Sequence, residues 1–144
     1  MQDHGPNPYV IDAVAAANQN IYFCSTLWTG SHLQVTVMAV PPEGDTGLTI
    51  QKEHDQYIRV ESGSARLVMG KDADNLQEWL VADGYAFVIP AGTCHNIINN
   101  GLDDLKMISL HGPVKYLRDT IHASKEEALS EQAEQASSGS PNNQ

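Results

Sequence analysis

The segment Gly84 to Asn99 reads G-Y-A-F-V-I-P-A-G-T-C-H-N-I-I-N and contains the most regular pattern in the chain. It fits the spacing G-x5-P-x-G-x2-H-x3-N at every fixed position, which predicts two short strands joined by a tight turn. Pro90 ends the first strand because its nitrogen cannot donate to a β-ladder, and Gly92 allows turn geometry that a side chain would hinder. His95 follows this turn, where its imidazole can point into a barrel and bind a metal or a ligand.

This pattern resembles the second conserved motif of the cupins, small barrels built as a double-stranded β-helix. The resemblance covers about residues 21–111, most of the chain. The segment Leu27 to Gly30, followed by His32 to Val40, is also similar to small single-domain bacterial cupins. The resemblance implies an all-β, jelly-roll-like cupin barrel. It also implies that His95 stands where metal-binding cupins have a histidine ligand.

The first cupin motif, usually G-x5-H-x-H-x3,4-E-x6-G, is only partly preserved. Its closing part is visible as Q-Y-I-R-V-E-S-G at residues 56–63. Counting back from Gly63 places Gln56 at the glutamate of the family, Gln51 at its second histidine and Thr49 at its first. Hydroxyl and amide groups bind first-row metals more weakly than imidazole or carboxylate groups. The resemblance therefore implies a weak site for Fe²⁺, Mn²⁺, Ni²⁺ or Zn²⁺, or no metal at all.

His54 is a second candidate metal ligand, beside His95. If the strand ending at Glu61 already begins at His54, alternation places His54 and Gln56 on one inward face. The other interpretation is that His54 lies in a solvated turn, K-E-H-D-Q. The predicted pocket consists of Thr49, Gln51, His54, Gln56 and His95.

Short segments in which apolar and polar residues alternate, separated by turns that contain Gly or Pro, predict an all-β domain. We expect an N-terminal arm at residues 1–20, the barrel at 21–112, a partly helical extension at 113–136 and a disordered tail at 137–144. Ser124 fits an N-cap and Glu127 has the capping-box spacing, which predicts a short C-terminal helix. The tail, S-S-G-S-P-N-N-Q, has the composition of a disordered segment. His111 can share an inward face with Met107 and Ser109, but its place at the end of a strand favours the surface.

Composition narrows the range of partners. A net charge of −10 disfavours nucleic acid and anionic membranes, because both would repel the protein. No apolar run approaches the about 20 residues of a membrane span, and the first residues do not read as a secretory signal. Cys24 and Cys94 read as free thiols in a reducing compartment. We therefore expect a cytoplasmic protein, and a homodimer because a small barrel has strand edges to cover.

Three functions are compatible with these features. The first is a barrel that binds a small polar molecule, with or without a weakly bound divalent metal. The second is a cupin metalloenzyme of the isomerase or dioxygenase type, in which His95 and His54 hold the metal with help from Glu53 or the glutamines. The third is a non-catalytic dimeric scaffold. The second motif is intact, but the first motif lacks most of the expected metal ligands. This combination favours the first function, the binding of a small polar molecule.

Overall fold

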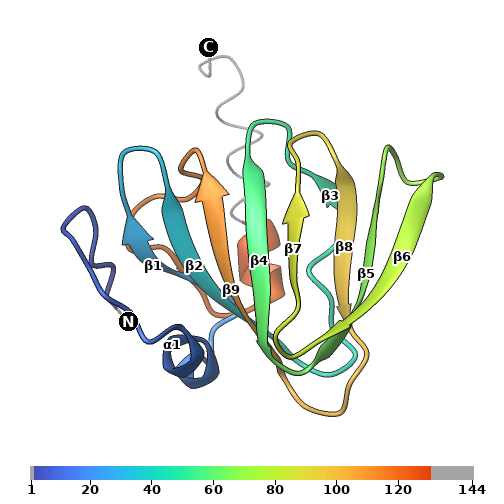
Figure 1. Cartoon of the computed structure of the whole chain (residues 1–144), viewed down its shortest axis with the longest axis horizontal. Helices are drawn as coiled ribbons and strands as arrows, with labels where there is room; N and C mark the ends of the chain where they lie inside the picture. The colour runs from blue at the N-terminus through green and yellow to red at the C-terminus, as the bar shows by residue number, and fades with distance from the viewer. Residues whose placement is uncertain (1, 131–144) are drawn as a thin grey trace.

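The computed structural model describes residues 2–130, and two antiparallel β-sheets face each other in it (Figure 1). The larger sheet has the strand order β10-β1-β2-β9-β4-β7. In that order its strands are Ile121–His122, Cys24–Thr29, Gln34–Val40, Leu105–Gly112, Asp55–Ser62 and Ala86–Ile89. The smaller sheet has the order β3-β8-β5-β6, with strands Thr49–Ile50, Cys94–Asn99, Ser64–Gly70 and Leu76–Ala82. This arrangement confirms the predicted all-β, jelly-roll-like barrel.

The turn predicted at Pro90 and Gly92 connects β7 to β8, and so connects the two sheets. Gly92 has a φ of +87°, which glycine adopts without steric cost. Its backbone nitrogen donates to the carbonyl oxygen of Gln51 at 2.8 Å. This bond holds the turn against the end of β3. As a result, His95 lies directly opposite Thr49 in the β3–β8 ladder.

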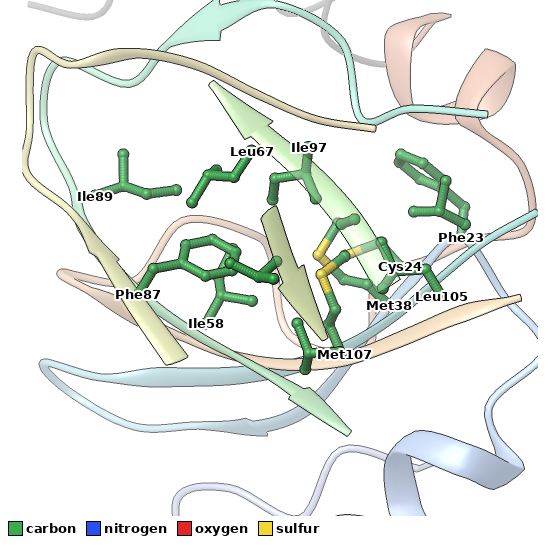
Figure 2. Close-up of a cluster of buried hydrophobic side chains, with 14 of the residues drawn as sticks. Phe23, Cys24, Met38, Ile58, Leu67, Phe87, Ile89, Ile97, Leu105 and Met107 are labelled. Carbon is green, nitrogen blue, oxygen red and sulfur yellow. The ribbon is translucent and has the colours of Figure 1, made fainter. Parts of the chain in front are cut away.

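The main hydrophobic core fills the space between the two sheets (Figure 2). Ile58 of β4, Leu67 of β5 and Met107 of β9 are each at most 1% exposed. Other labelled members of this core are Phe23, Cys24, Met38, Phe87, Ile89, Ile97 and Leu105. Removing this apolar surface from water is the main force that holds the sheets together.

A second, smaller hydrophobic cluster lies on the outer side of the larger sheet. The helix α1, Ala13–Gln19, contacts β2, β4 and β9. Asp12 caps it, since its side chain accepts a hydrogen bond from the backbone nitrogen of Ala15 at 3.1 Å. Ala17 of this helix packs with Leu27 and Val37. Strand β2 is therefore covered on both faces.

The N-terminal arm is tied to β1 through Asp3, which is fully buried. Its carboxylate accepts hydrogen bonds from the backbone nitrogen of Thr29 at 3.0 Å and from the hydroxyl of Thr29 at 2.6 Å. Burial alone would raise the pKa of Asp3, but these and other hydrogen bonds outweigh it and lower the pKa. The Asp3 carboxylate is therefore ionised, and its hydrogen bonds attach the N-terminal arm to the larger sheet.

The chain is helical again at residues 125–130. Ser124 caps this segment as predicted, because its hydroxyl accepts a hydrogen bond from the backbone nitrogen of Glu127 at 3.2 Å. The predicted disordered tail, residues 137–144, lies outside the described residues. Within residues 2–130 we find no helix with the length and apolar character to cross a membrane.

Candidate functional site

A cavity of about 170 Å³ lies between β3, β4 and β8, the segment that follows β9 and the C-terminal helical residues. One part of its wall is continuous with the hydrophobic core and contains Phe23, Met38, Ile58 and Ile97. Leu48, Ala128 and Leu129 add further apolar surface. The polar side chains in the remaining wall therefore decide which ligand this cavity can select.

Four of the five residues predicted for the pocket line this cavity: Thr49, Gln51, Gln56 and His95. Thr49 comes from β3, Gln51 follows it, and His95 comes from β8 of the same sheet. Gln56 reaches the cavity from β4 of the opposite sheet and is only 8% exposed. The structure thus brings residues from both sequence motifs to the wall of one cavity. Their role in ligand binding stays a prediction.

His95 has a defined tautomer. Its Nδ1 lies 3.0 Å from the carbonyl oxygen of Thr93, which can only accept, so Nδ1 carries the proton. Burial lowers the pKa of His95, and the nearby charge of Lys115 lowers it further, although the bond to Thr93 acts in the opposite direction. The ring is therefore neutral at pH 7, and its Nε2 lone pair can accept a hydrogen bond or bind a metal.

Gln56 is held by a buried hydrogen bond. Its Nε2 donates to the hydroxyl oxygen of Ser109 on the neighbouring strand β9 at 2.9 Å. The side-chain amide keeps its oxygen, an acceptor, and its second N–H, a donor, for a ligand.

His54 does not belong to the wall of this cavity. It lies just before β4, and its Nε2 is 3.3 Å from the carbonyl oxygen of Val114. The bond makes Nε2 a donor, and the other ring nitrogen, Nδ1, is buried and has no hydrogen-bond partner among the described residues. Burial alternates along β4 as predicted, with Gln56, Ile58 and Val60 inward. The proposed role of His54 as a metal ligand stays a prediction.

Lys115 is a cavity residue that the sequence did not reveal. It follows β9, and its Nζ lies 4.9 Å from the centroid of the Tyr116 ring. Burial lowers the pKa of Lys115, an effect that Cys24 partly offsets. The Lys115 ammonium forms no salt bridge within the described part of the chain. No hydrophobic period or motif marks this position, so only the folded chain could identify it.

His111 is buried, and the surface position favoured from the sequence was wrong. It is 2% exposed on the inward face of β9. Its Nε2 lies 3.3 Å from the hydroxyl of Ser109 and 3.4 Å from that of Thr36. Burial, followed by the nearby charges of Lys115 and His54, lowers the pKa of His111 to about 3, so its ring is neutral. Alternation with Met107 and Ser109 was the signal that favoured this inward position.

The residues around the cavity do not fit a tight metal centre. Tight first-row sites use three or four histidine, cysteine or carboxylate ligands. Within residues 2–130 the structure has no group of three such side chains placed to hold an ion. Among the described residues, His95 is the one such residue in the cavity wall, and Thr49, Gln51 and Gln56 add weaker oxygen donors to the same wall.

Comparisons with known proteins agree with this architecture. Residues 36–111 match the family described as "Cupin domain". The protein YrkC of Bacillus subtilis (strain 168) is 41% identical over 130 residues, which cover 90% of this chain and 70% of YrkC. The protein L612 of Acanthamoeba polyphaga mimivirus is 33% identical over 109 residues, which cover 75% of this chain and 67% of L612.

A solved structure gives the same result. The crystal structure of BH2720 from Bacillus halodurans superposes with a TM-score of 0.89 at 41% sequence identity. The match covers 90% of this chain and 99% of BH2720. The family model spans more than half of the chain. The protein is a member of the cupin family.

Proposed function

We propose that this cupin binds a small polar molecule in the cavity between its two sheets, and that any divalent metal there is bound weakly. The observation that carries the proposal is the convergence of one neutral imidazole, His95, with the uncharged polar side chains of Thr49, Gln51 and Gln56. A cavity with an apolar wall and a few converging polar groups is the usual form of a small-molecule site.

The metal part of the proposal is tested by the metal content of untagged protein. Elemental analysis before and after prolonged chelation is expected to show substoichiometric metal that the chelator removes. His95→Ala should abolish residual Fe²⁺, Mn²⁺, Ni²⁺ or Zn²⁺ binding, because it removes the one imidazole that residues 2–130 contribute to the cavity wall. His32→Ala, at an exposed histidine outside the cavity, is the matched control. Stoichiometric metal that survives chelation would overturn this part.

The ligand part is tested by ligand-observed NMR with a panel of small polar compounds. Compounds that bind the wild-type protein should lose affinity in both His95→Ala and Gln56→Ala, since these residues come from opposite walls of the cavity. His32→Ala should bind like wild type. Binding that is unchanged in both cavity variants would place the ligand elsewhere on the protein.

A further inference from the structure

Lys115 gives the cavity a positive charge that no carboxylate among residues 2–130 pairs with. The cavity wall contains two lysines, Lys115 and Lys125, and no Asp or Glu within the described residues. Lys125 forms an ion pair with Asp45, so its charge is already balanced. Lys115 instead lies against the face of the Tyr116 ring, with its Nζ 4.9 Å from the ring centroid. A cation over an aromatic face keeps its capacity to bind an anion.

A partly buried ammonium that has no counter-ion in the described part of the chain is an unusual feature, because removing a charge from water is costly. Burial lowers the pKa of Lys115, which is the expected consequence of this cost. An anion bound in the cavity would offset this free-energy cost by pairing with the Lys115 ammonium. The same positive charge opposes the binding of a divalent cation, in agreement with the poor set of metal donors around His95.

We propose, on the basis of the small-molecule function above, that the natural ligand carries a carboxylate and that Lys115 binds this carboxylate directly. Lys115 then supplies the positive charge that a metal ion supplies in other sites. One ammonium balances one negative charge, so a monocarboxylate fits this cavity better than a doubly charged phosphate.

The other polar groups specify the rest of the ligand. The His95 Nε2 lone pair and the Gln56 amide oxygen are both acceptors, while the His95 Nδ1–H donates to Thr93 and one of the two Gln56 Nε2–H groups donates to Ser109. A ligand that satisfies them must donate hydrogen bonds. A hydroxyl group beside the carboxylate meets this requirement, so the ligand class is a small hydroxy acid.

Three matched probes separate these contributions. Lactate carries both a carboxylate and a hydroxyl, lactamide lacks the charge, and propionate lacks the hydroxyl. Affinities measured by ligand-observed NMR should be at least about tenfold higher for lactate than for either analogue, because a charge-assisted hydrogen bond is lost in lactamide and a buried bond is left unmade in propionate. Lys115→Met should lose about tenfold in lactate affinity and bind lactamide like wild type.

Lys71→Met removes the same charge from an exposed loop and controls for the change in net charge. Circular dichroism checks that Lys115→Met is folded, and Lys115→Arg, which keeps the positive charge, should recover part of the affinity for lactate. Equal binding of lactate and lactamide, or undiminished lactate binding by folded Lys115→Met, would overturn the role of Lys115 while leaving a neutral polar ligand possible. A lack of binding by all three probes would reject the hydroxy-acid class, and the broader panel above would then decide the proposed function separately.

Discussion

Gln56 and Ser109 are joined by a hydrogen bond of 2.9 Å from the amide Nε2 to the hydroxyl Oγ, across the neighbouring strands β4 and β9. The pair holds a neutral side chain at the position where the family motif places a glutamate. With glutamine at this position, the described residues of the cavity wall include no carboxylate, which is the chemical reason for the weak metal binding that we expect.

The triple variant Thr49→His/Gln51→His/Gln56→Glu should convert the cavity into a tight metal site. It places two imidazoles and a carboxylate beside His95, in the pattern that the first cupin motif prescribes. Elemental analysis after loading with Mn²⁺ or Zn²⁺ and subsequent chelation should show about one retained ion per chain, and less in wild type. Equal retention by the two proteins would mean that these positions do not converge on one point.

Acidification should destabilise the protein through His111. Its folded-state pKa is about 3, against 6.5 for an unperturbed histidine, so the unfolded state binds the extra proton between these values. Stability is therefore greatest above about pH 6.5 and falls as the pH decreases, with His111 contributing a loss of about 2 kcal/mol from pH 7 to pH 5.

Denaturant unfolding of wild type and His111→Gln at several pH values measures this contribution. Between pH 7 and pH 5, His111→Gln should lose about 2 kcal/mol less unfolding free energy than wild type. This difference does not depend on how stable the variant is at pH 7. His32→Gln, at an exposed position, should follow the wild-type curve. Parallel curves for wild type and His111→Gln would show that His111 is not held neutral in the fold.

Asp3→Ala should lower the free energy of unfolding by about 2 kcal/mol, because it leaves partly buried donors on Thr29 without their charged acceptor. Asp103→Ala, which removes an exposed carboxylate, is the control and should change stability by less than about 0.5 kcal/mol. Equal unfolding free energies for Asp3→Ala and wild type would mean that the N-terminal arm does not stabilise the sheet.

We predict that the protein is a homodimer. Strand β7 is at the edge of the larger sheet, and Tyr85, just before it, and Val88, within it, expose 55% and 59% of their surface. Exposed strand edges with apolar side chains favour association with another chain. Light scattering at micromolar concentration should give about twice the chain mass of 15.7 kDa. A monomer mass at this concentration would contradict the prediction.

The parts of the fold that sequence predicted well are those where local chemistry and tertiary contacts agree. The turn after Pro90 and the cap at Ser124 each depend on bonds made within a few residues, and the conformation of Gly92 depends on its own lack of a side chain. The positions of Thr49, Gln51, Gln56 and His95 also followed from two motifs. These residues line one cavity because the turn bond from Gly92 to Gln51 holds the β7–β8 turn against the end of β3.

The parts that sequence did not predict depend on contacts between distant segments. Lys115 enters the cavity from an irregular segment after β9, where no periodic pattern constrains it. His111 was assigned to the surface because polar residues at strand ends are usually exposed, yet the Ser109 and Thr36 hydroxyls give it buried partners. These pairings could be recognised only when β2, β4 and β9 were placed side by side.

The double coverage of β2 has a consequence for how this protein tolerates mutation. Most strands at a protein surface accept changes at every second position, which gives saturation mutagenesis profiles a period of two. In β2, Thr36 and Met38 face the barrel interior while Val37 lies beneath α1, and all three are at most 8% exposed. A mutational scan of β2 should therefore show intolerance at consecutive positions. Substitutions on the inner face should affect ligand binding as well as stability, and those on the outer face stability alone.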